Sequence, residues 1–218
     1  SIRLSDMLLA SVLLSAFFAG VVATLVTVAI EKFGGRTGGV LATVPTTIVP
    51  AAIGMYSMSS GSEFDRAMSV VPLGMLVNAL FLLVWMKVPT RFGTGLVTTM
   101  ILSLLVWAMA GTVGLYGADL VQDEGLSELS FGLLLLLILV LLGIWSTWET
   151  VHAPKGKHRV RPLVLIARGS AAALAIGCAV WLSSLSYAMI SGLVSTFPAI
   201  FLTSMVALWL SQGQDVPQ

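Results

Sequence analysis

Apolar and polar positions follow one another along this chain in long blocks, not at the short periods of soluble helices or strands. Blocks of about 20 apolar residues are separated by short stretches that hold nearly all of the charged side chains. A helix needs about 20 consecutive apolar residues to cross a bilayer, whereas barrel strands would alternate over about 10. The pattern predicts an all-α, polytopic transmembrane bundle of about seven helices, at residues 7–30, 39–59, 67–88, 93–118, 131–148, 163–185 and 188–211.

Composition supports the same fold class. Hydrophobic residues make up 57% of the chain and charged residues 10%, whereas an ordinary soluble domain carries about 25% charge. We therefore expect an integral membrane protein, whose first block is too long for the core of a signal peptide and is retained as a helix. The single cysteine, Cys178, cannot form an intrachain disulfide and is expected to be a small buried side chain.

The charges between the blocks alternate in sign. Basic residues gather after the first, third and fifth blocks, and acidic residues after the second and fourth. The loop at residues 149–162 holds four of the 11 Lys and Arg residues, at 155, 157, 159 and 161. Because Lys and Arg favour the cytoplasmic side in short loops, the pattern predicts an outside N-terminus and a cytoplasmic C-terminus.

Two of the apolar blocks contain a similar proline motif. Gly39-Val-Leu-Ala-Thr43-Val-Pro45 recurs, with changes, as Gly192-Leu-Val-Ser-Thr196-Phe-Pro198. Proline removes a backbone donor and interrupts a helix, and paired interrupted helices point to the substrate site of a transporter. The alternative is that glycine and proline are simply more frequent in membrane helices.

Aligning the two motifs places the first helix on the sixth and the second on the seventh. Helices five apart run in opposite directions, so the match predicts a degenerate inverted repeat. Residues 1–118 would form the first unit (helices 1–4). Residues 119–162 would supply an acidic outer loop, a leucine-rich, lipid-facing linker helix and a basic cytoplasmic loop, and residues 163–218 an abbreviated second unit (helices 6–7).

The segment Ile190-Ser-Gly-Leu-Val-Ser-Thr-Phe-Pro-Ala-Ile-Phe201, and less clearly residues 38–45, resembles a stretch of GlpM-type small bacterial inner-membrane proteins. The resemblance implies a bacterial inner-membrane location and an inverted duplication of a unit of about four helices. It implies no activity, because the family has no settled one. The abbreviated second unit leaves three explanations open: a shortened half, a longer parent chain, or completion by a second copy in a homodimer.

The sequence offers no arrangement for catalysis, metal binding or a cofactor. It has no HExxH, GxSxG or phosphate-loop motif and no Cys–His cluster, so an enzyme is not expected. We instead predict a transporter or channel for a small solute, either anionic or neutral and polar. The alternative is a non-transporting subunit or scaffold that packs in the bilayer against lipids or other membrane proteins.

Hydroxyls and prolines of the two motifs are the candidate substrate-binding residues, together with two arginines as charge partners. Hydroxyls next to a proline either contact a ligand or only satisfy backbone groups that the proline frees. Arg168 lies inside the sixth block, where it either faces a substrate path or reaches the headgroups. Asn78, the one amide within the blocks, is expected to bond helix to helix, with a ligand contact as the alternative. The candidate site residues are Thr43, Pro45, Thr46, Thr196, Pro198, Arg168 and Arg36.

Overall fold

The secondary structure of the described residues consists of α-helices joined by short turns. The computed structural model describes residues 2–33, 46–123, 125, 127–147 and 162–212. The helices in these ranges are α1 (Ile2–Phe33), α3 (Ile48–Met58), α4 (Gly61–Ser69), α5 (Val71–Phe92), α6 (Leu96–Asp123), α7 (Glu128–Thr147), α8 (Pro162–Ser184), α9 (Ala188–Ser195) and α10 (Ala199–Gln212).

The helices are those of a polytopic membrane protein. Within the described residues, five segments are long and apolar enough to cross a bilayer, and α3 and α7 are shorter apolar helices. The five segments are Asp6–Ala29, Gly61–Phe92, Leu96–Val121, Pro162–Ser184 and Ala188–Leu210. These seven helical regions follow the order of the seven apolar blocks, so the predicted all-α membrane bundle is confirmed.

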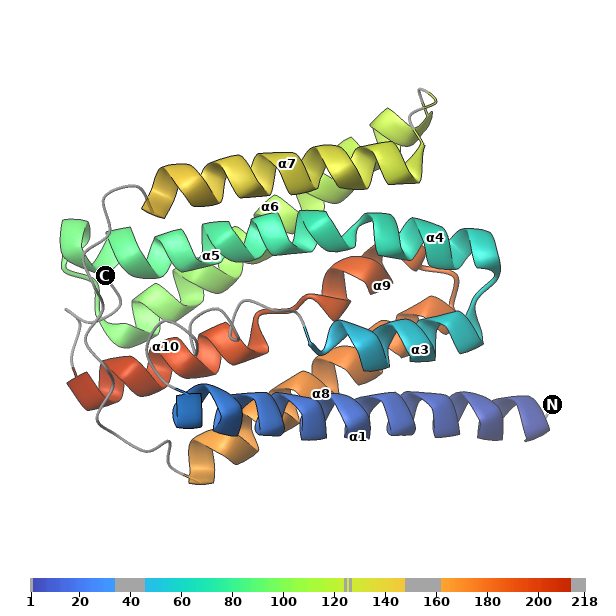
Figure 1. Ribbon diagram of the computed structural model, residues 1–218, viewed down its shortest axis with the longest axis horizontal. Coiled ribbons are helices and arrows are strands. Elements are labelled where there is room, and N and C mark those ends of the chain that lie inside the picture. Colours follow the sequence, from blue (N-terminus) through green and yellow to red (C-terminus); the bar gives the residue numbers. More distant parts are fainter. Residues whose placement is uncertain (1, 34–45, 124, 126, 148–161, 213–218) are drawn as a thin grey trace.

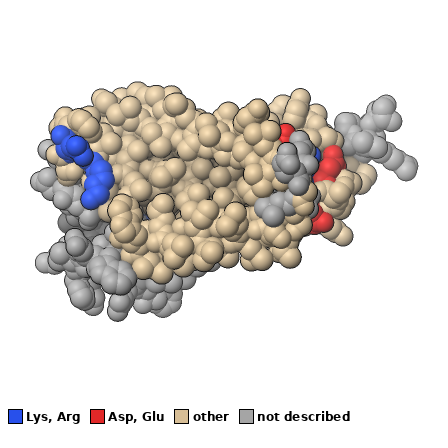
Figure 2. Space-filling view, turned by 90° about the horizontal axis from the view of Figure 1, so that it is seen from above, with Lys and Arg blue, Asp and Glu red and all other residues tan. Residues whose placement is uncertain are grey.

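The bundle has an acidic end and a basic end. α5 ends beside Lys87 and Arg91 at the end of the bundle where α6 begins (Figure 1). Glu63 and Asp65 lie near the start of α4 at the opposite end of the bundle. Asp119 lies in the last turns of α6 at that same end. On the face shown in Figure 2, one end carries basic atoms and the other carries mainly acidic atoms, with a small basic patch beside them, and an uncharged surface separates the two ends. An apolar band between two charged ends is what a bilayer core and its two interfaces require.

Local sequence explains where the central helices begin and end. At the start of α4, Ser60 and Glu63 form a capping box, in which the Glu63 carboxylate accepts from the Ser60 N–H at 3.0 Å. Pro72 stands at the start of α5 and supplies no N–H to continue α4, so the two helices are separated at Val70. α5 ends at Gly93, whose φ of 60° is readily adopted by glycine.

The helices pack in two groups, with α9 and α10 between them. α1 and α8 run antiparallel and form the most extensive helix pair, and α3 packs on both. α5 packs against α6 and α7 on the other side of the bundle. α9 contacts α4, α5 and α8, while α10 contacts α6 and α8, so the interrupted helix joins the two groups.

Three expectations from the sequence change. The second apolar block is predicted at residues 39–59; its part up to residue 45 lies outside the described residues, and Thr46 and Thr47 form a turn before α3 begins at Ile48. Cys178 was predicted to be buried, and that prediction is wrong because its side chain is exposed on α8. α7 was predicted to face lipid and it does expose leucines, yet Leu139 and Gly143 also line a cavity, so α7 also packs toward the rest of the bundle.

Candidate functional site

The seventh apolar block is interrupted at its proline. α9 ends at Ser195, α10 begins at Ala199, and Thr196 leaves the helix with φ −97° and ψ 9°. The Ser195 hydroxyl donates to the Gly192 carbonyl at 2.6 Å, and the Thr196 hydroxyl to the Leu193 carbonyl at 2.7 Å. Both hydroxyls thus satisfy the last turn of α9 in this structure, which leaves only their oxygen lone pairs for a ligand.

Asn78 of α5 satisfies a backbone group in this interruption. In a continuous helix the Thr196 carbonyl would accept from the N–H four residues later. Here the Asn78 amide donates to that carbonyl at 2.8 Å, and the Trp107 indole of α6 donates to the Asn78 Oδ1 at 2.9 Å. The Trp107 ring also meets Phe197 edge to face at 5.3 Å. The predicted helix-to-helix role of Asn78 is therefore confirmed.

Gly74 of α5, which has no side chain, makes room for Thr196. Gly74 of α5 faces it so closely that a Cβ built at residue 74 would lie 1.9 Å from the Thr196 Oγ1. Only glycine allows α5 to approach the interruption at this distance. Gly74 and Asn78 are one helical turn apart on α5, so one face of α5 both receives Thr196 and bonds its carbonyl.

The turn directly after the first proline motif contributes the facing wall. Pro45 lies outside the described residues, but Thr46 and Thr47 form a turn that leads into α3. The Thr46 hydroxyl is buried and has no hydrogen-bond partner among the described residues. Thr47 precedes α3 without a side-chain cap on the helix N-terminus. Polar groups of this kind are costly to bury in a membrane unless a partner meets them.

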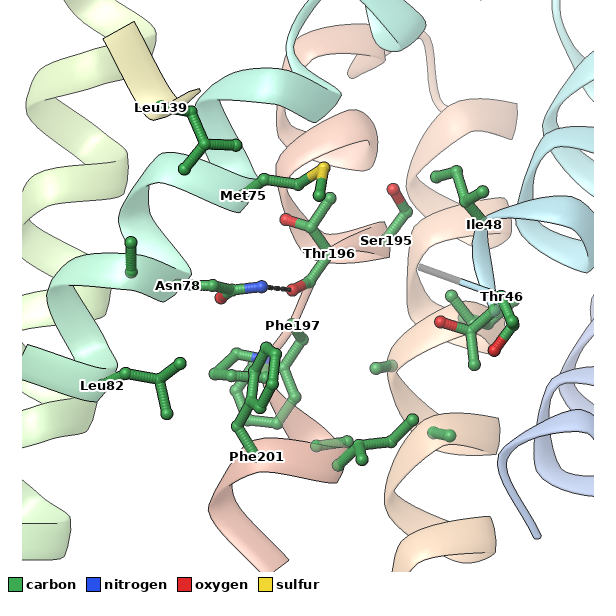
Figure 3. A pocket seen from close by; sticks show the side chains of 18 of the residues that line it. Thr46, Ile48, Met75, Asn78, Leu82, Leu139, Ser195, Thr196, Phe197 and Phe201 are labelled. Atoms are coloured by element: carbon green, nitrogen blue, oxygen red, sulfur yellow. Dashed lines mark hydrogen bonds between the residues drawn. The ribbon is translucent and has the colours of Figure 1, made fainter. Parts of the chain in front are cut away.

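The turn that follows the first motif and the interruption in the second motif line one cavity of about 310 Å³ (Figure 3). Thr46 and Ile48 lie on one side of the view, Asn78 and Leu82 on the other, and Phe197 and Phe201 close it below. No side chain of Lys, Arg, Asp, Glu or His lines it in the described part of the chain. The lining residues are Thr46, Thr47, Ile48, Met75, Asn78, Ala79, Leu82, Leu139, Gly143, Ala172, Ala175, Ile176, Ser195, Thr196, Phe197, Pro198, Ala199, Ile200 and Phe201.

α3 and α10 both begin at the cavity and run to opposite ends of the bundle (Figure 1). At 1.5 Å per residue, the 11 residues of α3 and the 14 of α10 extend for about 16 and about 21 Å. Each is shorter than the hydrocarbon core of about 30 Å. The positive ends of two helix dipoles are thus directed at one mostly apolar space.

Arg168 does not line this cavity, but its side chain is turned into the bundle. It is 6% exposed. Its Nε donates to the Thr203 hydroxyl of α10 at 3.1 Å, and its Nη1 donates to the Thr27 hydroxyl of α1 at 3.2 Å. Arg168 therefore bonds to two other helices instead of lying exposed at the helix surface, and its place on a substrate path stays a prediction.

The structure brings together three of the predicted site residues: Thr46, Thr196 and Pro198. Thr43, Pro45 and Arg36 lie outside the described residues. Sequence reasoning missed Trp107, although a tryptophan N–H in an apolar block needs a partner. It also missed the cavity wall of α7, for which a leucine-rich sequence gives no signal.

Known proteins give no guide to this site: no protein-family model, no curated protein and no solved structure matches the chain. The GlpM-type resemblance therefore stays a prediction from sequence.

Proposed function

We propose that this membrane protein is a transporter or channel, and that a small solute passes through the cavity between α3, α5, α8 and α10. One observation carries the proposal: Thr46 and Thr47, which directly follow the first proline motif, line the same cavity as Thr196 and Pro198 of the second motif, about 150 residues away in the sequence. Interrupted helices that meet inside a bundle are a recurrent way to build a solute site in a membrane. The absence of ionisable side chains from the described lining supports a role in binding and passage, not catalysis.

The size and chemistry of the cavity support a small, weakly polar occupant. Its volume of about 310 Å³ is at the lower end of ligand pockets, which hold roughly 300–1,000 Å³. Asn78 keeps one amide hydrogen and one oxygen lone pair after its bonds to Thr196 and Trp107. Together with the Thr46 hydroxyl, these groups offer a solute both donors and acceptors.

The proposal includes an inverted relation between the two halves. The opposite directions of α3 and α10 from a shared cavity, and the antiparallel pairing of α1 with α8, support such a relation. In this arrangement the basic end is cytoplasmic and the acidic end is outside, with the N-terminus outside, in a bacterial inner membrane. Rocking of one half against the other would open the cavity to each side in turn.

The test is solute flux in liposomes that contain the purified protein. Swelling assays with glycerol, urea, formate, chloride and inorganic phosphate should identify at least one solute that enters faster than into protein-free liposomes. Ala79→Leu and Ala175→Leu place larger side chains on the cavity wall and should each lower that flux at least about tenfold. Ala108→Leu, at an exposed position on α6, is the matched control and should leave it unchanged.

Two results would contradict the proposal. Flux at the level of protein-free liposomes for every solute would favour the alternative, a scaffold that packs against lipids or other membrane proteins. Full flux in folded Ala79→Leu and Ala175→Leu proteins would mean that the cavity is not the route. Folding is checked in each variant by the thermal unfolding midpoint in detergent.

A further inference from the structure

Arg168 is a buried cation within a membrane span. It is 6% exposed, on a segment of α8 that is apolar enough to cross a bilayer. Charged side chains are expensive to hold at such positions, and they mark ion paths or binding sites more often than packing contacts. The side chain is held between three helices, because it donates to Thr27 of α1 and to Thr203 of α10.

Its charge is not neutralised by any carboxylate in the described part of the chain. The one ion pair found there joins Arg66 to Asp119 at the acidic end of the bundle. The hydroxyls of Thr27 and Thr203 serve Arg168 as neutral acceptors, and each donates its own proton to a carbonyl of its helix, Ala23 and Ala199 respectively. Neutral acceptors orient a guanidinium but carry no negative charge, and none of the carboxylates whose side chains are described supplies one. A buried cation strongly favours an anion as partner.

Arg168 and its two partners form a layer directly beside the cavity. Ala23, Ala172 and Ala199 pack together, and the last two also line the cavity. Thr27, Arg168 and Thr203 each stand four residues from one of these alanines, so they occupy the next turn on the same three helices. In all three helices the step leads toward the basic end (Figure 1), so Arg168 lies one helical turn beyond the alanines that line the cavity.

We propose that Arg168, Thr27 and Thr203 form a binding site for a small anion at the basic end of the cavity, and that the transported solutes include small carboxylates such as formate. This inference rests on the proposed function, because the site lies on the same route. A guanidinium carries five N–H donors and binds a carboxylate through two parallel hydrogen bonds. Nε and Nη1 have partners here, so further donors remain for the anion.

The first test is a binding measurement that needs no transport. Formate is titrated into the purified protein in neutral detergent, with ionic strength kept constant by sodium gluconate, whose anion is much larger than formate. The thermal midpoint of the wild-type protein should rise by several degrees. Arg168→Gln should lose this rise, and Arg168→Lys, which keeps the charge without the planar fork, should show a smaller one. Arg91→Gln removes an exposed charge at the same end and should respond like the wild type.

The second test is the ratio of formate flux to glycerol flux in liposomes. Arg168→Gln should lower that ratio at least about tenfold, while Arg91→Gln should not change it. If glycerol passes and neither the midpoint nor the ratio depends on Arg168, the anion site is refuted and the proposed function stands. If no solute passes but the formate-dependent midpoint shift disappears in Arg168→Gln, the site stands and transport is refuted. If the thermal midpoint of the wild-type protein does not change with formate, the anion site is refuted. If Arg168→Gln does not fold, the smaller midpoint shift expected for Arg168→Lys is the test.

Discussion

The amide of Asn78 donates to the carbonyl of Thr196 at 2.8 Å, across 118 positions of sequence. This carbonyl is one that the interruption between α9 and α10 leaves without its usual helical donor. The contact therefore links α5 to the only segment of the described chain where a proline motif visibly separates two helices. It also places the one amide of the membrane blocks on the wall of the cavity.

Replacing Asn78 by leucine tests how much this link stabilises the fold. Asn78→Leu keeps a similar volume but removes the donor to Thr196 and the acceptor for Trp107. Each interhelical hydrogen bond in a membrane protein contributes about 0.6–2 kcal/mol. In a detergent titration, the free energy of unfolding should decrease by an amount within this range or somewhat above it, because a buried carbonyl also loses its partner.

Trp107→Phe is the matched control for Asn78→Leu. It removes the bond to Asn78 Oδ1 and can keep the edge-to-face contact with Phe197, so it should destabilise the protein less than Asn78→Leu. An Asn78→Leu protein as stable as the wild type would show that the bond to Thr196 contributes nothing to the fold.

A second prediction concerns the contact of α9 with α4. A Cβ at Gly192 would lie 2.1 Å from the backbone oxygen of Ala67, and backbone cannot move away as a side chain can. Gly192→Ala should destabilise the protein by about 1–3 kcal/mol or prevent folding. Gly117 of α6 has nothing within 4 Å of a built Cβ, so Gly117→Ala should be neutral or gain about 0.5–1 kcal/mol in helix stability. Equal thermal midpoints for the two variants would contradict this packing.

Much of the fold follows from block length, because the thickness of a bilayer sets how many apolar residues a crossing helix needs. The interruption at Pro198 was predictable for a local reason, since proline lacks the donor that a continuous helix uses. Which face of a helix packs was not predictable. In a bilayer the outer faces are as apolar as the inner ones, so hydrophobicity did not reveal that Cys178 is exposed or that Leu139 lines the cavity.

The residues of the candidate site were predictable in part, but the contacts between them were not. The prolines and hydroxyls of the motifs pointed to Thr46, Thr196 and Pro198, which line the cavity. The direction of Arg168 depends on Thr27 and Thr203 of two other helices, and such contacts between distant segments have no signature in one sequence. The same holds for the bond from Trp107 to Asn78.

The proposed orientation in the membrane is tested by labelling single cysteines. In a Cys178→Ser background, Ser62→Cys lies at the acidic end on α4 and Gly95→Cys lies at the basic end before α6, and both positions are exposed. A thiol reagent that cannot cross membranes should label the residue 62 variant in intact cells. It should label the residue 95 variant only after the cells are opened. The reverse result would place the basic end outside and refute the proposed topology.

The last prediction separates the interruption at Pro198 from the stability of the fold. Pro198→Ala restores an N–H, which in a continuous helix would donate to the Val194 carbonyl. That carbonyl now accepts from Phe197 at 3.0 Å. With the proline removed, α9 and α10 can join, and the Thr196 carbonyl then bonds within the helix instead of to Asn78. The thermal midpoint should stay equal or rise, since proline in a helix interior is unfavourable by about 3 kcal/mol, whereas solute flux should fall at least about tenfold.

Pro72→Ala is the control for this variant, because Pro72 stands at the start of α5, where proline is tolerated. It should leave both the midpoint and the flux close to those of the wild type. A Pro198→Ala protein that is stable and fully active would mean that the interruption is not needed for passage. A protein that loses stability and flux together would mean that Pro198 serves the fold. The proposal that the interruption opens the cavity is supported only if Pro198→Ala keeps the thermal midpoint and loses the flux.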